Sequence, residues 1–324
     1  MRVFVAGGTG VVGRRLVPQL VARGHQVIAT TTSAAKLDLL AQLGADGVVM
    51  GGLDVVSVKA AVAAARPDAI VHQMTGLGTG KPDMRHPDRF FTTTNRLRIE
   101  GTDHLLAAAE ATGVPHVLVQ SFAQSYTPGA GLLTEEDPID PGTATMARRI
   151  SQGVMHIQDV VPMAGGTVLR YGGFYGPGAS DDVVEMVRKR KFPLVGEGTG
   201  YNSWVHLDDA ASATVLAVEK HAKGVFNIVD DEPAQVREWL PYLAACAGAK
   251  PPMRVPKWLA KLLAGEFAVT LMTEGRGFSN AKAKRELGWV LRYPSWRQGF
   301  TEELALPRTE EFEQSQGRAA WSLG

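Results

Sequence analysis

Cysteine is almost missing from this sequence, because Cys246 is the only one among 324 residues. A disulfide within the chain and a zinc site built on cysteines are therefore excluded. An excess of basic charge is missing as well: 34 lysines and arginines stand against 33 aspartates and glutamates, a net charge of +1. Proteins that bind nucleic acids usually carry many more basic residues to meet phosphates, so we predict no nucleic-acid partner.

Long apolar runs are also absent, since none approaches the ~18 residues that a membrane span requires. No charged segment followed by an apolar one precedes residues 1–6, which already have the pattern of a strand, so we expect no signal peptide. The apolar fraction of 45% and the charged fraction of 21% are ordinary for globular proteins. These features predict a folded cytoplasmic protein without a membrane partner.

Short β-rich apolar runs alternate with helical patterns in the first half of the chain. The expected strands are residues 2–6, 26–30, 47–50, 69–73, 116–120 and 168–170. The expected helices run from the first strand to about residue 23 and over residues 35–43, 56–65 and 95–112. This alternation predicts an α/β fold, a doubly wound parallel sheet of the Rossmann type with helices on both faces.

Periodicity is weaker in the second half, where glycine, proline and aromatic residues cluster at 171–204. A helix at 208–221 and a strand at 225–229 are expected there. Two short helices are expected at 236–247 and 258–263.

A glycine string joins the first strand to the first helix. Gly7, Gly10 and Gly13 satisfy G-x-x-G-x-x-G, and Gly8 completes G-x-G-x-x-G. Without Cβ atoms the backbone can approach a pyrophosphate, and the helix N-terminus offers N–H groups and a positive dipole end. We therefore predict a dinucleotide site, whose alternative is a plain glycine turn. Its expected contacts are Gly7, Thr9, Gly10, Val11, Val12 and Gly13.

An acidic residue is missing at the end of the second strand, where an NAD site usually has one for the ribose 2′-hydroxyl. Thr30, Thr31, Thr32 and Ser33 stand there instead, and the next acid is Asp38. Arginines follow Gly13, and a lysine follows the hydroxyl cluster. Hydroxyls with a cation suit a 2′-phosphate, although such arginines can also be solvated helix residues. The predicted cofactor is therefore NADP(H), held here by Arg14, Thr31, Thr32, Ser33 and Lys36.

Several further motifs accompany the glycine loop. They are GTDHLLAAA at 101–109, LRYGGFYGPG at 169–178, VGEG at 195–198 with WVHLDDA at 204–210, FNI at 226–228, and SNAK at 279–282 with LGW at 287–289. Over nearly its whole length the chain resembles the short-chain dehydrogenase/reductase superfamily, in its extended or atypical branch, the NAD-dependent epimerase/dehydratase group.

This resemblance implies a Rossmann domain, a smaller and sequence-discontinuous C-terminal substrate domain, and a homodimer. The Rossmann domain would take residues 1–170 with 204–230 returning to it, the substrate domain 171–203 and 231–308, and a tail 309–324. Contacts with the cofactor are also expected from Met74, Thr75 and Gly76 after the fourth strand and from Gly173 and Phe174 after the sixth.

The family's usual catalytic group is a Ser or Thr with a Tyr-x-x-x-Lys pair, and this pair is missing. No tyrosine or lysine occurs between residues 141 and 170, where Thr145 and Arg149 are the positional equivalents. The serine position falls at Phe122, with Ser121 beside it, and Gly51 stands where an adenine-side acid is expected. Ordinary alcohol–ketone chemistry through a tyrosinate is therefore not expected.

Other side chains could assist the reaction at the carboxyl edge of the sheet. We predict a substrate hydrogen bond from Ser121, a proton donor in Tyr126 or Tyr175, and a ribose-binding cation in Arg149. Each tyrosine has a packing role as its alternative. The long loop at 75–94 is interpreted as a lid over the substrate.

These features predict an NADPH-dependent reductase of a small carbonyl, imine or enone compound. An imine or iminium is already activated, so it has less need of a protein acid. A non-catalytic dinucleotide sensor is one alternative. The other, a sugar-nucleotide epimerase or dehydratase with bound NAD, needs the missing base most.

Overall fold

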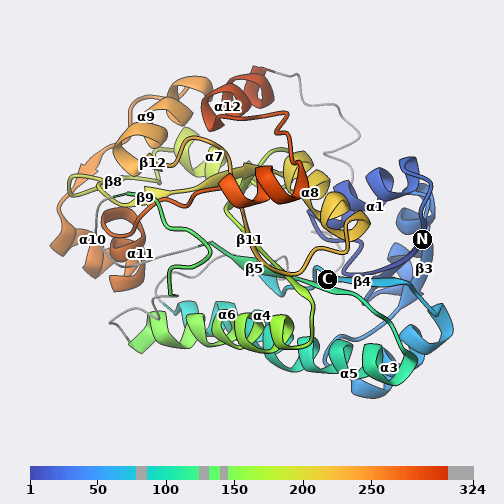
Figure 1. Ribbon diagram of the computed structural model, residues 1–324. Coiled ribbons are helices and arrows are strands. Elements are labelled where there is room, and N and C mark those ends of the chain that lie inside the picture. The colour runs from blue at the N-terminus through green and yellow to red at the C-terminus, as the bar shows by residue number, and fades with distance from the viewer. Residues whose placement is uncertain (78–85, 124–130, 139–144, 306–324) are drawn as a thin grey trace, which may run out of the picture.

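A parallel seven-stranded sheet forms the centre of the molecule (Figure 1). The computed structural model describes residues 1–77, 86–123, 131–138 and 145–305, and at 145–150 it describes the helix backbone alone. The sheet has the strand order β11-β6-β5-β4-β1-β2-β3. Its strands are β1 (Arg2–Ala6), β2 (Gln26–Thr31), β3 (Asp46–Val49), β4 (Ala69–His72), β5 (Val117–Phe122), β6 (Thr167–Tyr171) and β11 (Gly224–Ile228). The order reverses between β1 and β4, and ligands of such sheets bind at this switch point.

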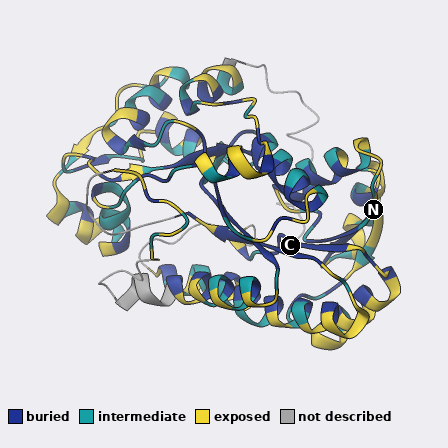
Figure 2. Cartoon of the chain, viewed as in Figure 1, coloured by how far each residue is buried: buried dark blue, intermediate teal, exposed yellow. Residues whose placement is uncertain are grey.

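Helices cover both faces of the sheet (Figure 1). One face packs against α1 (Gly13–Ala22), α2 (Leu37–Gln42) and α8 (Leu207–Glu219). The other packs against α3 (Val55–Ala65), α5 (Thr102–Thr112) and α6 (Thr145–Met163). Strand residues alternate between these two layers: Val3 and Val5 face the first, and Phe4 and Ala6 face the second. Both layers are buried, as Figure 2 shows.

The C-terminal half adds short strands and helices around a third apolar cluster. Its strand pairs are β7 (Gly173–Tyr175) with β10 (Trp204–His206), β8 (Leu194–Val195) with β13 (Arg254–Val255), and β9 (Tyr201–Asn202) with β12 (Ala234–Gln235). Its helices are α7 (Asp181–Arg188), α9 (Val236–Cys246), α10 (Lys257–Ala264), α11 (Glu266–Thr273) and α12 (Trp296–Ala305). Aromatic rings such as those of Trp204, Trp239 and Phe300 meet edge to face there.

Two buried aspartates hold the C-terminal segment. The Asp209 carboxylate accepts hydrogen bonds from the N–H groups of Arg292 and Tyr293, both at 2.8 Å. The Asp230 carboxylate accepts one from the N–H of Trp296, also at 2.8 Å. Burial raises the pKa of both carboxyl groups, well above the ordinary value at Asp230. Backbone donors therefore fix this segment against α8 and β11.

The predicted fold class is confirmed, and two element boundaries and one helix differ from the prediction. The helix expected at 95–112 begins earlier, as α4 (Pro87–Arg96), and continues through a π-helical turn (Leu97–Gly101) into α5. The last part of the predicted lid is therefore helical. Strand β5 extends to Phe122, so it includes both Ser121 and Phe122. Helix α6 was not predicted, although Val154, Ile157 and Val161 recur at helical spacing and are buried.

Other predictions are left open by the structure. The domain boundaries stay predictions, and residues 309–324 lie outside the described chain. None of the described helices is long and apolar enough to cross a membrane.

Candidate functional site

The glycine loop forms a turn too tight for side chains. Gly7 has φ +95°, and a Cβ there would lie 3.0 Å from the carbonyl of Gln73. A Cβ on Gly13 would lie 2.5 Å from the carbonyl oxygen of Gly7. Because both clashes are with backbone, the loop is packed against the end of β4 and leaves its outer side to a ligand.

The start of α1 fits a pyrophosphate. In the described chain, the N–H groups of Val11, Val12 and Gly13 have no acceptor. The first turn of α1 contains no acidic residue. Free N–H groups at a positive dipole end attract an anion. The loop residues predicted from the sequence thus lie together around the free N–H groups at the start of α1.

Hydrogen bonds at the end of β2 bring together three of the five residues predicted to meet the 2′-phosphate side of the cofactor, Arg14, Thr31 and Ser33, with Thr9 of the glycine loop. The Thr31 hydroxyl accepts hydrogen bonds from the Thr9 hydroxyl at 3.4 Å and from the Ser33 N–H at 3.3 Å. Arg14 donates from Nε to the carbonyl of Thr9 at 2.9 Å. Thr32 and Lys36 are exposed beside this group, and they complete the predicted set.

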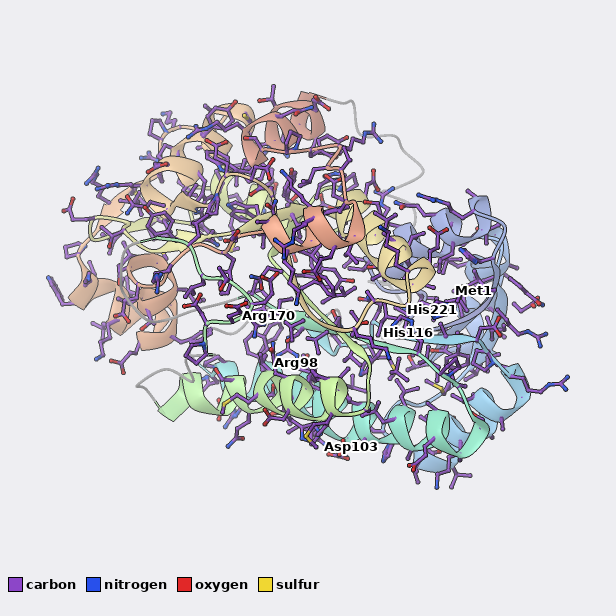
Figure 3. All side chains as sticks on the ribbon, in the orientation of Figure 1. Met1, Arg98, Asp103, His116, Arg170 and His221 are labelled. Atoms are coloured by element: carbon purple, nitrogen blue, oxygen red, sulfur yellow. The ribbon has the colours of Figure 1, made fainter. Side chains whose placement is uncertain are left out.

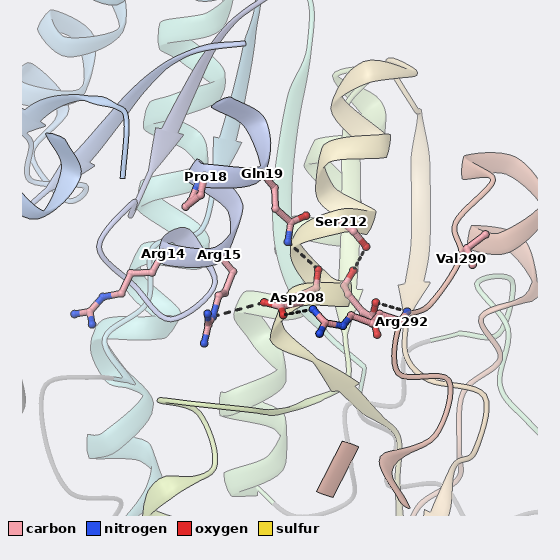
Figure 4. Close-up of a pocket in the computed structure, with 9 residues that line it drawn as sticks. Arg14, Arg15, Pro18, Gln19, Asp208, Ser212, Val290 and Arg292 are labelled. Atoms are coloured by element: carbon pink, nitrogen blue, oxygen red, sulfur yellow. Dashed lines mark hydrogen bonds and ion pairs between the residues drawn. The ribbon is translucent and has the colours of Figure 1, made fainter. Parts of the chain in front are cut away.

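The two arginines that follow the glycine loop both line a pocket between α1 and α8, and their side chains point in different directions (Figure 4). Arg15 and Arg292 each lie 3.7 Å from the carboxylate of Asp208, so the two guanidinium groups share this acid. Arg14 points away from Asp208, and no described carboxylate forms an ion pair with it. Its charge is therefore left for an anionic ligand.

The segment after β4 is fixed by a buried histidine that the sequence did not single out. The N–H of Met74 donates to His72 Nδ1, and His72 Nε2 donates to the carbonyl of Leu97 in the π-helical turn, both at 3.1 Å. Burial lowers the pKa of His72 to about 4, so the ring is neutral. The N–H of Gly76 donates to Thr94 Oγ1 at 3.1 Å. Residues 74–76, predicted to contact the cofactor, are thereby held against α4.

Strands β5 and β6 end in a contrasting set of side chains. Ser121 is buried, and its Oγ has no hydrogen-bond partner in the described chain. Its neighbour Phe122 is 37% exposed. Arg170, opposite Ser121 in the register, donates from Nε to Gln158 Oε1 of α6 at 3.0 Å, and burial lowers its pKa. Arg98 and Arg170 lie on the side of the sheet that α4 and α6 cover (Figure 3).

A relay of three polar side chains lies beside this edge. Gln73 donates from Nε2 to the Tyr171 hydroxyl at 2.9 Å, and that hydroxyl lies 2.6 Å from Thr214 Oγ1. The ring of Phe174 packs 5.3 Å from that of Tyr171. This relay was not predicted, because it joins β4, β6 and α8, which are distant in the sequence.

Tyr175, predicted as a proton donor or a packing residue, lies inside the third apolar cluster. It is 1% exposed, and its ring centroid is 5.2 Å from those of His206 and Phe300. Its hydroxyl has no partner in the described chain, and burial raises its pKa. Because no part of this phenol faces a ligand, the geometry favours the packing role.

Three of the remaining predicted side chains, those of Tyr126, Thr145 and Arg149, lie outside the part of the chain that the structure describes. The backbone of Thr145 and Arg149 belongs to the first turns of α6. Gly173 and Phe174 lie in β7, beside the end of β6. Their predicted roles stay predictions.

The model of the NAD dependent epimerase/dehydratase family matches residues 3–229 of this chain. The chain belongs to that family. A 3-diazoavenalumate denitrifying reductase from a Streptomyces species is 42% identical over 316 residues, which cover 94% of this chain and 100% of the relative. A 2-alkyl-3-oxoalkanoate reductase from Stenotrophomonas maltophilia is 32% identical over 270 residues, 77% of this chain and 76% of the relative.

Solved structures of the epimerase/dehydratase type share the fold. UDP-glucose 4-epimerase from Thermus thermophilus, in complex with NAD, has a TM-score of 0.73 at 22% identity, covering 97% of this chain and 99% of that one. Human epimerase family protein SDR39U1, with NADPH, has a TM-score of 0.74 at 21% identity, covering 94% and 99%. With its reductase relatives, this family member is a small-molecule reductase, and its cofactor is a nicotinamide dinucleotide.

Proposed function

We propose that this family member is an NADPH-dependent reductase whose substrate is already electrophilic enough to need no proton from the protein. The observation that carries the proposal is the carboxyl edge of β5, where a phenyl ring, Phe122, takes the place of the family's hydroxyl. The α6 sequence also lacks the tyrosine and lysine that would move a proton. Carbonyl reduction normally needs an acid near the developing oxyanion.

The preference for NADPH rests on Arg14 and the hydroxyls at the end of β2. Arg14 is held by the carbonyl of Thr9, with the hydroxyls of Thr31 and Ser33 close by, and Asp208 neutralises Arg15 rather than Arg14. A guanidinium with hydroxyl donors suits a phosphate dianion. Asp38 lies in α2, beyond the end of β2 at which an NAD site has its acid.

Among the carbonyl, imine and enone substrates predicted, positively charged electrophiles such as iminium ions have the least need of a protein acid, and the name of the Streptomyces relative extends the class to diazo compounds. When bound, the reduced dinucleotide supplies a hydride, with which an arenediazonium ion becomes the arene and dinitrogen as NADPH becomes NADP⁺, without any proton exchanged with the protein. An iminium ion likewise needs only the hydride.

This chain's own residues would then bind and shield the substrate. Ser121, whose buried Oγ has no hydrogen-bond partner in the described chain, would donate its hydrogen bond once a substrate is seated against the end of β5. The Gln73–Tyr171–Thr214 relay closes the sheet below the edge, which excludes water from beneath the substrate. Burial raises the pKa of Tyr171 to about 12, so this phenol stays neutral. Its role is to hold the Gln73–Tyr171–Thr214 relay together by hydrogen bonds and not to exchange a proton with the substrate.

The test is turnover of matched substrates with NADPH: 4-methoxybenzenediazonium, a cyclic iminium ion, and 4-methoxybenzaldehyde. NADPH alone and heat-denatured protein measure the uncatalysed background. We expect the two cations to be reduced far faster than the aldehyde, with one anisole formed from the diazonium ion per NADPH consumed. Catalysis limited to the aldehyde would contradict the proposal, and hydride transfer to none of them would favour the dinucleotide sensor.

The epimerase alternative has weaker support, because UDP-glucose 4-epimerase from Corynebacterium glutamicum is only 25% identical to this chain. Turnover of a UDP-sugar with NAD would restore it. The homodimer and the cytoplasmic location implied above stay predictions, and sedimentation of the purified protein tests the first.

A further inference from the structure

Phe122 is an apolar ring left exposed at the end of an interior strand. Strand β5 lies between β4 and β6, and its residues 117–121 are all buried, yet Phe122 is 37% exposed. We infer that Phe122 is the platform on which the aromatic ring of a cationic substrate stacks, an inference that deepens the proposed function and rests on it. The residue would thus decide substrate class without taking part in proton transfer.

The strand register shows which way this ring points. Side chains alternate along β5, so Phe122 shares a face with Leu118, which belongs to the apolar layer under α1 and α8. Its partner across the strands, Tyr171, belongs to the same layer. Ser121 points to the opposite face. Phe122 and Ser121 therefore bracket the carboxyl edge of β5 from its two sides.

The hydrogen bond from Gln73 to the Tyr171 hydroxyl lies on the same face of the sheet as the ring of Phe122. His72 pairs with Val119 and Tyr171 with Phe122, so the bond from Gln73 to the Tyr171 hydroxyl crosses β5 on the amino-terminal side of Phe122. Phe122 is the first side chain of β5 above it on that face, and it stands at the edge where ligands of such sheets bind.

Predicted cofactor contacts lie on both sides of the ring. On the β4 side, Gln120 donates from Nε2 to the carbonyl of Met74 at 3.2 Å, which ties the 74–76 segment to β5. On the β6 side, the half-buried ring of Phe174 packs against Tyr171. A substrate beside the cofactor would therefore lie against Phe122.

The chemistry of a phenyl face selects an aromatic cation. The face of the ring carries negative charge density, which attracts a cation and favours offset stacking with an electron-poor ring. An arenediazonium ion and an aromatic iminium ion have both properties, whereas a neutral aliphatic ketone has neither. The same position that lacks a hydroxyl for acid catalysis thus gains a binding surface for substrates that do not need one.

The test measures binding of unreactive probes to protein saturated with NADP⁺, so that the probes do not compete for the cofactor's site. The probes are N-methylquinolinium and N,N-dimethyldecahydroquinolinium, which share a bicyclic skeleton and a charge but differ in aromaticity. Calorimetry should show that the wild type prefers the aromatic cation, and Phe122→Leu should bind it roughly five- to thirtyfold more weakly. Phe122→Tyr should restore most of the affinity.

A control and the opposite results complete the design. Trp258→Leu removes an aromatic ring that is 70% exposed on α10 and should leave both affinities unchanged. Equal binding of the two probes by the wild type, weak binding of both, or no loss in Phe122→Leu would overturn the inference. If Phe122→Leu weakens binding of the aromatic probe as expected while NADPH reduces none of the cations, the stacking role of Phe122 is supported and the proposed reductase activity is contradicted.

Discussion

The two halves of the sheet's carboxyl edge obey the family pattern to different degrees. At β1 and β2, the glycine loop, the free N–H groups of α1 and the hydroxyl cluster have the arrangement that a dinucleotide needs. At β5 and β6, a buried hydroxyl and an exposed phenyl ring replace the expected catalytic side chains. The comparison teaches that the residues for cofactor binding and those for proton transfer are separable parts of this site, and that among the described residues only the first set follows the family pattern.

The largest expected effect is a loss of cofactor binding at the part of the carboxyl edge formed by β1 and β2, which we call the cofactor half. Gly13→Ala would place a Cβ 2.5 Å from the backbone oxygen of Gly7, a clash that no side-chain movement relieves. We expect loss of measurable NADPH binding by fluorescence titration, together with a lower Tm. Gly10→Ala is the matched control for folding, because its Cβ would meet only the Gly7 carbonyl oxygen at 3.3 Å. Unchanged NADPH affinity in Gly13→Ala would contradict the described turn.

The next effect concerns His72, which holds the predicted cofactor-contacting residues 74–76 through its hydrogen bonds to Met74 and Leu97. Its pKa is about 4 in the folded protein and 6.5 in the unfolded chain, so only the unfolded chain gains the proton between these values. Folding stability should therefore fall as pH drops from about 7 to 4, with a contribution of about 3 kcal/mol. Urea unfolding at several pH values measures it.

The variant His72→Gln separates this contribution from those of other groups. Carboxyl groups titrate in the same pH range. The contribution of His72 is therefore the difference between the wild type and the variant in how the free energy of unfolding depends on pH. A wild-type profile parallel to that of the variant would show that the buried imidazole does not cause the loss.

Arg14 sharpens the comparison within the cofactor half. Arg14→Ala should weaken NADPH binding roughly tenfold to a hundredfold, since charge-assisted hydrogen bonds to the 2′-phosphate are lost. NADH affinity should not change. Arg15→Ala is the matched control, because Arg15 pairs with Asp208 and should not affect either affinity. Equal losses for both dinucleotides would show that Arg14 does not recognise the 2′-phosphate.

The smallest expected effect concerns Tyr175, which lies in the third apolar cluster rather than at the ends of β5 and β6. Tyr175→Phe removes a buried hydroxyl without a described partner, so kcat should stay within about twofold and Tm should not fall. Steady-state rates with NADPH and the best substrate measure this. A loss of kcat by several orders of magnitude would return Tyr175 to the role of proton donor.

The residues predicted for the cofactor half lie close together at the ends of β1 and β2, because local sequence patterns specify this part of the chain. Glycines at fixed spacing between a strand and a helix leave few other structures, and Thr31, Ser33 and Arg14 follow within one β-α-β unit. The other half is built by contacts between distant segments. The Gln73–Tyr171–Thr214 relay and the His72–Leu97 bond have no local signal. The substitution at Phe122 was visible in the sequence, but its exposure required the structure.

The central claim is that the protein contributes no proton to the reaction. The most direct measurement is the pH profile and the solvent isotope effect on kcat/KM for 4-methoxybenzenediazonium with NADPH, corrected for the uncatalysed rate. The account predicts a flat profile across the range where substrate and cofactor are stable, and nearly equal rates in H₂O and D₂O. A rate that falls as one protein group loses its proton, together with a rate at least twofold slower in D₂O, would contradict it.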